Sequence, residues 1–355
     1  MRPEQLLAAV LCCAIGIVVV EGKVLQNTPA NIRILTFNIW NSGQNVQDGL
    51  LKIAKHIKLV DPDIVALQEV EDKSHFDSIV TSLGAPWKGF YHDSSYPDTG
   101  IITKHEIVDG SQAQAYAAVG AKVKVTLKTN DAFSKPNTVI VNFWSLHLDW
   151  RSYGPYAACN KLVTDASQIM AGEMNLGVDA AGRVQNVRDI LSNSAFKQAI
   201  LNSNREPLIV GGDFNAPSHL DWTEATKNDH CGWEFPWPST KLIIEESGLQ
   251  DSFRELYPNP ETDPGVTWST VQTFTDQGWG WTVPEPQDRI DMILYRSKRL
   301  IPRRSYTYKG TEPVHRKPNH FQNDYPSDHY AVVTDFEYID GAQNMYENDD
   351  NLIDY

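Results

Sequence analysis

The chain has 355 residues, of which 41% are hydrophobic, and 45 acidic residues against 31 basic ones give it a net charge of −14. An acidic surface repels polyanions at long range, which argues against a basic protein that coats nucleic acid, but it suits a site that collects divalent cations. A chain of this length can form one two-sheet domain, and we find no composition break or internal repeat between residues 31 and 337.

The N-terminal residues 1–22 have the pattern of a secretory signal peptide. Arg2 supplies a positive charge, and residues 6–20 form an apolar run that small or polar residues follow. The run is shorter than the roughly 20 residues that span a membrane, although a retained membrane anchor is the alternative. We therefore expect a secreted, extracellular protein.

The cysteines support this expectation. Cys12 and Cys13 lie in the signal, and Cys159 and Cys231 remain in the mature chain. Two cysteines in an oxidising compartment predict one disulfide, with two separate buried thiols as the alternative.

The first two strands each carry a polar residue at or near their end. Residues 31–39 read as a strand that contains Asn38, a polar group that needs a partner inside an apolar run. Residues 46–60 have the apolar spacing of an amphipathic helix. Residues 63–69 read as a second strand, which Glu69 closes with a carboxylate.

The next segments follow the same pattern. Residues 96–103 read as a loop that leads into a strand, and residues 121–127 and 139–148 read as further strands, the second with His147 near its end. Residues 149–205 form the largest insertion, with helices expected at 161–170 and 184–191. Because this insertion begins directly after His147, we expect it to overhang the site.

Residues 208–217 are the centre of the pattern. Three apolar residues predict a buried strand, two glycines allow close backbone packing, and Asp213 and Asn215 follow at i and i+2. In an extended chain that spacing directs both side chains to the same side. An ordinary turn after a strand is the alternative.

The last third carries tryptophans and two further acidic motifs. A helix is expected at 239–247, a strand with Asp291 at 287–294 and a final strand at 330–336, directly after Asp328 and His329. The basic segment 296–317 could face a phosphate, but a solvated strand edge is the favoured interpretation. Residues 338–355 read as a disordered acidic tail. The tryptophans between the Asp213 and Asp291 motifs are Trp222, Trp233, Trp237, Trp268, Trp279 and Trp281.

Polar residues thus recur at the ends of apolar strands. They are Asn38, Glu69, Asp98, His147, Asp213, Asn215, Asp291, Asp328 and His329. Carboxylate and amide oxygens suit Mg²⁺, with Mn²⁺ or Ca²⁺ as alternatives. The chain has no Cys-x-x-Cys, His-Glu-x-x-His or P-loop motif that would indicate another kind of site.

Six motifs resemble those of the endonuclease/exonuclease/phosphatase superfamily, in order and approximate spacing. They are Thr-Phe-Asn38-Ile-Trp, Leu-Gln-Glu69-Val, Ser-Leu-His147-Leu, Gly-Gly-Asp213-Phe-Asn215, Arg-Ile-Asp291 and Ser-Asp328-His329. The resemblance implies an α+β fold, a four-layer α/β sandwich of two packed mixed β-sheets flanked by helices, over a catalytic domain at residues 31–337. It also implies that Glu69 is the principal Mg²⁺ ligand, with Asn38 and Asp328 as further metal residues.

The resemblance implies catalytic roles as well. Asp213 and Asn215 resemble the pair that orients the attacking water and the phosphate. His329, paired with Asp291, resembles the histidine that faces the scissile phosphate, and His147 resembles the second histidine. A carboxylate that holds a histidine raises its pKa and fixes its tautomer.

Two further features concern the substrate. Tyr96 and Asp98 resemble the aromatic-x-acid pair of the deoxyribonucleases, in which the acid supports His147. Lys122 and Lys124 stand where a deoxyribonuclease would place an arginine on phosphate, which argues against duplex DNA.

We therefore expect a secreted, Mg²⁺-dependent phosphoester hydrolase, in particular a phosphodiesterase of small, lipid or single-stranded substrates. The alternatives are an endonuclease of duplex DNA and a non-catalytic binding protein on the same fold. The expected partner is a phosphodiester in a nucleic acid, nucleotide or phospholipid. Tryptophan loops could contact a membrane surface, and the sequence indicates no protein partner.

Overall fold

The computed structural model describes residues 19–20, 23–24, 32–94, 98–127, 137–174, 182–274 and 283–339. The predicted signal (apart from Val19–Val20), Tyr96, Trp279, Trp281 and the tail from residue 340 lie outside this part of the chain. Within the described part, no helix is both long enough and apolar enough to cross a membrane.

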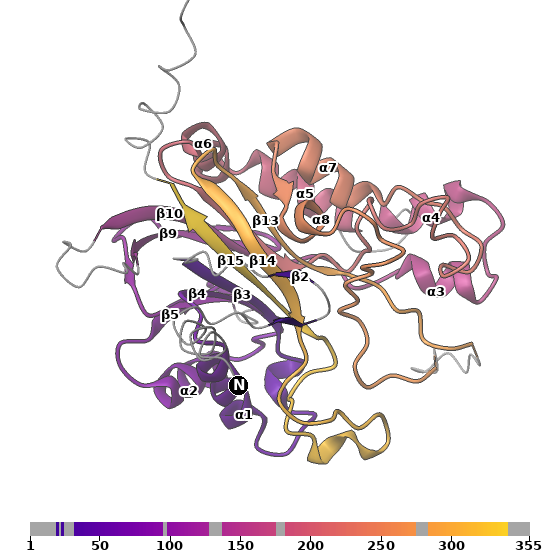
Figure 1. Cartoon of the computed structure of the whole chain (residues 1–355), viewed down its shortest axis with the longest axis horizontal. Coiled ribbons are helices and arrows are strands. Elements are labelled where there is room, and N and C mark those ends of the chain that lie inside the picture. The colour runs from indigo at the N-terminus through magenta and orange to yellow at the C-terminus, as the bar shows by residue number, and fades with distance from the viewer. Residues whose placement is uncertain are drawn as a thin grey trace, which may run out of the picture.

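A six-stranded mixed sheet forms one inner layer of the molecule (Figure 1). Its order is β14-β15-β3-β4-β6-β5, with β3 and β4 parallel and the other neighbours antiparallel. The strands are β3 (Ile32–Asn38), β4 (Ile64–Gln68), β5 (Lys88–Tyr91), β6 (Thr99–Thr103), β14 (Leu300–Tyr308) and β15 (Ala331–Tyr338).

A seven-stranded mixed sheet forms the second inner layer. Its order is β12-β13-β11-β10-β9-β7, and β8 also pairs with β9. The strands are β7 (Glu106–Ile107), β8 (Ala113–Ala115), β9 (Ala118–Thr126), β10 (Thr138–His147), β11 (Leu208–Asp213), β12 (Gln250–Asp251) and β13 (Asp291–Arg296). A separate hairpin joins β1 (Val19–Val20) and β2 (Lys23–Val24).

The two sheets pack face to face through branched and aromatic side chains. Ile34 and Ala66 of one sheet belong to the same buried cluster as Phe143 and Ile209 of the other. Gly211 faces this interface, because a Cβ atom there would lie 3.1 Å from the Cβ of Ala66. The first of the two central glycines therefore lets the sheets approach each other closely.

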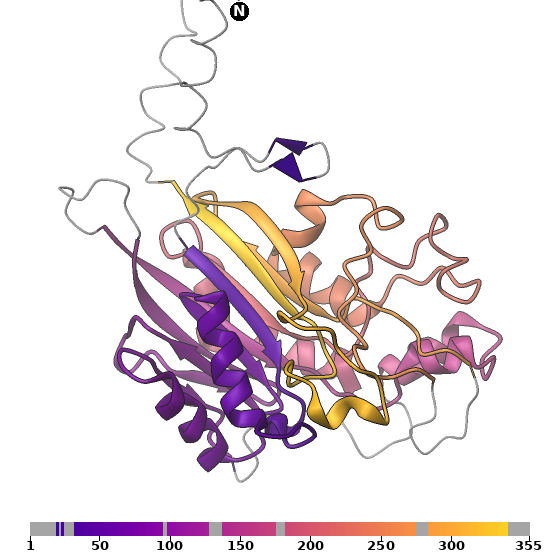
Figure 2. The ribbon, with the colours of Figure 1, turned by 60° about the horizontal axis from the view of Figure 1, so that its bottom comes forward.

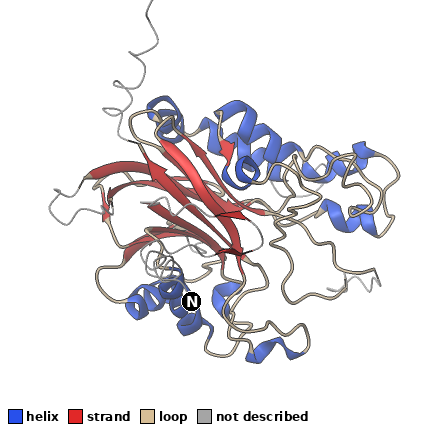
Figure 3. Cartoon of the chain, in the orientation of Figure 1, coloured by secondary structure: helices blue, strands red, loops and turns tan. Residues whose placement is uncertain are grey.

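Helices cover the outer face of each sheet and complete four layers, as Figures 2 and 3 show. Helices α1 (Gly49–Val60) and α2 (Lys73–Leu83) pack on the six-stranded sheet. Helices α5 (Gly182–Ser192), α6 (Ser194–Asn202) and α7 (Pro238–Ser247) pack on the seven-stranded sheet. The predicted sandwich is confirmed.

The insertion after β10 differs from its prediction in detail. The expected helix at 161–170 is wrong, because two helices, α3 (Gly154–Cys159) and α4 (Ala166–Glu173), flank a break there. Asp165 and Gln168 form a capping box that begins α4. Helix α6 was not predicted. Short helices are η2 (Asn41–Gly43), α8 (Ser252–Leu256) and η3 (Asn319–Gln322).

A disulfide joins Cys159 in α3 to Cys231, as the sequence predicted, with 5.2 Å between their Cα atoms. It ties the insertion to the segment that carries Trp222 and Trp237. Both tryptophans are fully buried in a cluster with Ala158 of the insertion. They are therefore packing residues and offer no surface to a substrate or membrane.

The basic segment forms a sheet edge. Strand β14 is the outermost strand of the six-stranded sheet. Arg303 pairs with Glu337, and Arg304 pairs with Asp335, both on the neighbouring β15. The favoured interpretation of a solvated strand edge is confirmed for these arginines.

Candidate active site

Strand register places three of the predicted residues in a row. In the seven-stranded sheet His147 pairs with Asp213, and Asp213 pairs with Asp291, so that the ends of β10, β11 and β13 carry them side by side. All three side chains are buried. The predicted strand-end cluster therefore follows directly from the register of this sheet.

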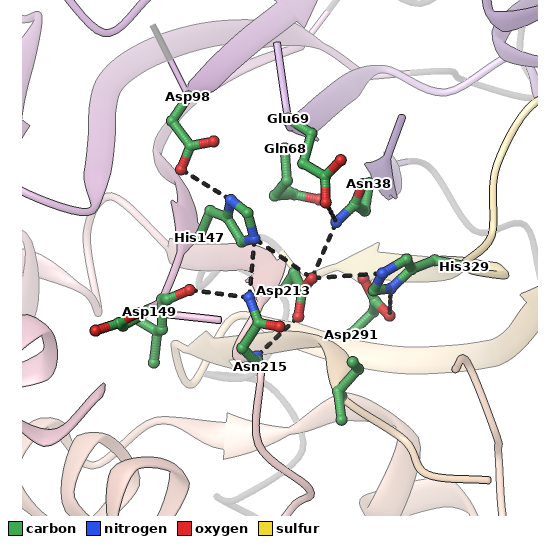
Figure 4. A network of polar contacts seen from close by, with 12 residues as sticks. Asn38, Gln68, Glu69, Asp98, His147, Asp149, Asp213, Asn215, Asp291 and His329 are labelled. Atoms are coloured by element: carbon green, nitrogen blue, oxygen red, sulfur yellow. Dashed lines mark hydrogen bonds and ion pairs between the residues drawn. The ribbon is translucent and has the colours of Figure 1, made fainter. Parts of the chain in front are cut away.

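The six-stranded sheet supplies the opposite side. Asn38 ends β3, opposite Gln68 at the end of β4. Glu69 follows with a φ of 61°, a left-handed conformation that is uncommon outside glycine. Asn38 Nδ2 lies 3.0 Å from both Glu69 Oε1 and Asp213 Oδ2, so it connects the two sheets (Figure 4).

A cavity of about 820 Å³ opens over this cluster. Residues from both sheets and from the insertion line it. The predicted site residues among them are Glu69, Asp98, His147, Asn215, Asp328 and His329.

His147 is held between two polar groups. Its Nδ1 lies 2.8 Å from Asp98 Oδ2, and its Nε2 lies 2.9 Å from Asn215 Nδ2 (Figure 4). Burial lowers the pKa of His147, but the carboxylates of Asp98 and Asp213 outweigh it and raise the pKa to about 10. The predicted contact between Asp98 and His147 is present.

His329 has a matching arrangement. Its Nδ1 lies 2.9 Å from Asp291 Oδ2, and its Nε2 lies 3.8 Å from Asp213 Oδ2. Burial lowers its pKa, and the nearby Asp291 and Asp213 raise it to about 10. With Nδ1 engaged by a carboxylate, Nε2 is the nitrogen of His329 that faces the centre of the site.

Asp213 is that centre. Its Oδ1 accepts from the backbone N–H of Asn215 at 2.8 Å, and its Oδ2 lies 3.6 Å from His147 Nε2. Burial and the neighbouring Asp291 raise the pKa of Asp213. A carboxylate that is both buried and close to a like charge has a strong affinity for a proton, as a general base requires.

Several oxygen atoms here fit a divalent cation. The buried Oδ1 atoms of Asp291 and Asp328 have no hydrogen-bond partner among the described residues. Burial and the charge of Glu69 raise the pKa of Asp328 to about 8, so a cation beside these carboxylates would favour their ionised form. Asp213, Asp291 and His329 bring ligand atoms within 4.8 Å of one another, but the hydrogen bond between Asp291 and His329 already accounts for part of this grouping.

Other cavity residues were not predicted as site residues. They include Trp40, Glu71, Tyr116, Trp150, Arg151, Trp268 and Lys317. Trp150 is 68% exposed. It lies two residues beyond the His147 motif, and this closeness in sequence could have indicated it as a site residue. Lys317 is the last residue of the basic segment 296–317, for which contact with a phosphate was the alternative interpretation, and its Nζ lies 5.3 Å from the ring centroid of Trp40. The sequence does not indicate the contact with Trp40.

Of the two expectations about the substrate, the one for the lysines needs correction, and the one for Tyr96 lies outside the described residues. Lys122 and Lys124 of β9 are not among the residues that line the cavity, and they pair with Glu206 and Glu106. They therefore give no information about phosphate binding. Tyr96 falls outside the described residues, so its pairing with Asp98 stays a prediction.

Comparison with known proteins adds family and fold. The sequence model described as Endonuclease/Exonuclease/phosphatase family matches residues 35–329. Uncharacterized protein F14F9.5 of Caenorhabditis elegans is 46% identical over 313 residues, which cover 88% of this chain and 93% of that protein.

Two solved structures share the fold. One is TDP2 of D. rerio complexed with a single strand DNA product, 16% identical with a TM-score of 0.51, covering 87% of this chain and 100% of that one. The other is an endonuclease/exonuclease/phosphatase family protein from Bacteroides thetaiotaomicron, 14% identical with a TM-score of 0.52, covering 88% and 99%.

Proposed function

The chain belongs to the endonuclease/exonuclease/phosphatase family of phosphoester hydrolases, and on that premise we propose that it is a Mg²⁺-dependent phosphodiesterase of small, lipid or single-stranded substrates. The observation that carries this proposal is the position of Asp213. Its Oδ2 lies among Asn38 Nδ2, His147 Nε2 and His329 Nε2 at 3.0, 3.6 and 3.8 Å. A base surrounded by cationic and amide donors is what hydrolysis of an anionic ester requires.

The residues divide the chemistry between them. Asp213 accepts a proton from the attacking water, whose oxygen forms the new bond to phosphorus while the bond from phosphorus to the leaving oxygen breaks. The leaving oxygen takes up a proton from solvent water and departs as an alcohol. His329 Nε2 donates to a phosphoryl oxygen, and because Asp291 fixes the orientation of this ring, the donor is in place before the reaction. His147, which binds Asp98 through Nδ1 and accepts from Asn215 Nδ2 through Nε2, positions Asn215 beside the base.

Glu69 and Asp328 would hold the cation. Both line the cavity, and Asp328 Oδ1 is a buried oxygen without a hydrogen-bond partner in the described chain. A bound divalent cation polarises a phosphoryl oxygen and stabilises negative charge on the leaving group. Asn38 is better suited to positioning than to coordination, because its Oδ1 accepts from the Trp40 N–H at 2.9 Å and its Nδ2 faces the carboxylates.

Charge supports a small or singly charged diester over duplex DNA. Proteins that bind duplexes usually rely on several Lys or Arg contacts to phosphates. The described cavity lining contains only Arg151 and Lys317 of these types, and Arg151 is bonded to Asp149. A duplex endonuclease remains the alternative that the experiment must separate.

Hydrolysis assays test the proposal. Purified protein should hydrolyse bis(p-nitrophenyl) phosphate with Mg²⁺, lose this activity in chelator and regain it when Mg²⁺ is added back. Small diesters or sphingomyelin should be cleaved faster than plasmid DNA under matched conditions. Activity that survives saturating chelator would contradict metal dependence, and efficient nicking of plasmid with no cleavage of small diesters would favour the nuclease.

Secretion is part of the same proposal. The N-terminal apolar run and the disulfide between Cys159 and Cys231 both support it, since disulfides persist in oxidising compartments. Expression of the full chain in a eukaryotic secretory host, followed by N-terminal sequencing of the medium, should show cleavage near residue 22. A chain retained in the membrane fraction would favour the anchor.

A further inference from the structure

An aromatic wall, defined here as Tyr153, Tyr156 and Trp268, forms part of the cavity lining. The Tyr153 hydroxyl donates to Asp288 Oδ2 at 3.0 Å, and the Tyr156 hydroxyl donates to Glu285 Oε1 at 2.5 Å. The Trp268 indole N–H donates to the same Glu285 oxygen at 2.8 Å. Because carboxylates engage the polar atom of every ring, the aromatic wall presents mainly carbon surface to the cavity.

The rings of the aromatic wall are continuous with the catalytic centre. The ring centroids of Tyr153 and Tyr156 are 4.9 Å apart, with planes at 86°. Tyr156 and Trp268 meet at the shared Glu285 oxygen, and Trp268 lies 4.7 Å from the ring of His329. A group attached to a phosphate at His329 would therefore reach the aromatic wall directly.

Negative charge lies behind these rings. Asp288 and Glu285 are both buried. Burial raises the pKa of Asp288 to about 6, which leaves it ionised at neutral pH. An aromatic face attracts cations through its quadrupole, and a hydroxyl that donates to a carboxylate makes its ring more electron-rich.

Acidic side chains also outnumber Lys and Arg in the rest of the described cavity lining. The carboxylates are Glu69, Glu71, Asp98, Asp149 and Asp328, and the basic side chains are Arg151 and Lys317. A divalent cation held by Glu69 and Asp328 would face the single negative charge of a phosphodiester. A positive group on the substrate would then match the remaining field, whereas further phosphates would oppose it.

We propose that the aromatic wall is a binding subsite for a quaternary ammonium group, so that the substrate of the proposed phosphodiesterase is a choline phosphodiester. This inference rests on the proposed function and specifies its substrate. A trimethylammonium group has an apolar surface and no N–H to donate, so aromatic carbon suits it better than exposed carboxylate oxygens. A neutral nucleobase could also stack on aromatic rings, but it would gain little from the carboxylates behind them.

The subsite is tested in the unaltered protein by comparing a substrate that carries the positive charge with one of the same shape that lacks it. The substrates are p-nitrophenyl phosphorylcholine and its dimethylbutyl isostere, in which carbon replaces the quaternary nitrogen. Phosphorus NMR counts cleavage of either ester bond. We expect the KM of the choline ester to be lower by about tenfold or more, the factor that corresponds to about 1.4 kcal/mol.

The outcomes separate the two proposals. Equal KM values for choline ester and isostere, with both hydrolysed, would overturn the subsite and leave the phosphodiesterase proposal standing. A preference for dinucleotides over both esters would also overturn it and favour base stacking. Failure to hydrolyse these esters and bis(p-nitrophenyl) phosphate would instead contradict the proposed function. Sphingomyelin vesicles and soluble glycerophosphocholine, compared in parallel, distinguish a lipid source of the head group from a free one.

Variants locate the subsite. Tyr156→Leu removes a ring and should bring the KM ratio of isostere to choline ester close to one, whereas Tyr156→Phe keeps the ring and should retain most of the ratio. Tyr116→Leu is the matched control, because Tyr116 is 69% exposed at the cavity and lies outside the aromatic wall. An unchanged ratio in folded Tyr156→Leu protein would overturn the assignment.

Discussion

The Nδ2 atom of Asn38 lies 3.0 Å from Asp213 Oδ2, and these two residues end strands that belong to different sheets. The same nitrogen lies 3.0 Å from Glu69 Oε1. One amide group therefore links the proposed metal ligand to the proposed base. This contact sets the distance between two carboxylates that would otherwise repel each other.

Replacement of Asn38 by aspartate should be more harmful than its near-identical shape suggests. The new carboxylate would face those of Glu69 and Asp213, where the amide N–H groups now donate. We expect kcat to fall about 10²-fold, since both proton transfer and cation placement depend on this geometry. Steady-state kinetics checks this, and Gln44→Glu, the same amide-to-acid change at an exposed residue nearby, serves as control. Normal kcat in Asn38→Asp would show that the link is dispensable.

Loss of the Asp213 charge should separate activity from stability. Burial and Asp291 both disfavour the ionised carboxylate, so its removal should not lower the thermal midpoint. Asp213→Ala should reduce kcat by ~10²-fold or more, as expected for a general base. Asp213→Asn keeps the shape and should lose a comparable factor. An active Asp213→Asn enzyme would mean that the side chain acts by position alone and that the base lies elsewhere.

The proposed metal residues should control the cation requirement. Glu69→Gln and Asp328→Asn each remove a charged oxygen from the pocket, so we expect the half-saturating Mg²⁺ concentration to rise by about tenfold or more. Titration of activity against free Mg²⁺ measures this value. Glu71→Gln, another acid of the cavity, should change it less. A larger increase in the half-saturating Mg²⁺ concentration for Glu71→Gln than for the other two variants would indicate that Glu71 binds the cation instead.

Much of this site could be predicted because strand ends and register place it. Glu69, His147 and Asp213 each lie at or directly after the end of a strand, where a polar residue that follows an apolar run identifies the position. Asp291 begins the apolar strand β13. Alternation and apolar runs also predicted the strands that carry them. These features are local in sequence, which is why sequence analysis could find them.

Other features depend on contacts that no local pattern encodes. Asn38 could be recognised as a site residue from the sequence. The hydrogen bond that its Oδ1 accepts from the Trp40 N–H depends on the folded loop. Lys317 reaches Trp40 across most of the chain. The break before α4 was different, because Asp165 and Gln168 carried a capping-box signal that apolar periodicity alone could not show.

The Asp288 carboxyl should make the stability of the protein depend on pH in the acidic range. Its pKa rises from 3.8 to about 6 because burial outweighs the hydrogen bonds from Trp222 and Tyr153. Between these pH values the folded protein holds a proton that the unfolded chain has lost, so the free energy of unfolding decreases as pH rises. The free energy of unfolding falls by about 3 kcal/mol in total over this range, and the decrease is complete above about pH 6. Asp288→Asn should flatten this part of the curve of midpoint against pH, and an unchanged slope would contradict the assignment.

The buried pair of Arg183 and Glu173 should control the loop that carries Trp150. Arg183 Nε lies 2.6 Å from Glu173 Oε1, and its other nitrogens donate to the carbonyls of Asp149, Arg151 and Ser152. Arg183→Met leaves the Glu173 charge buried, with Ser239 as its one remaining donor among the described residues, so we expect a loss of ~3–5 kcal/mol in the free energy of unfolding. The double replacement Arg183→Met with Glu173→Met removes both charges and should recover most of that loss.

The loop carbonyls of Asp149, Arg151 and Ser152 stay unpaired in the double variant, so its KM should remain raised although its stability returns. Urea denaturation and steady-state kinetics on the three proteins measure both quantities. If stability and KM recovered together, the arginine would act only through its charge, and its contacts with the loop would have no separate role.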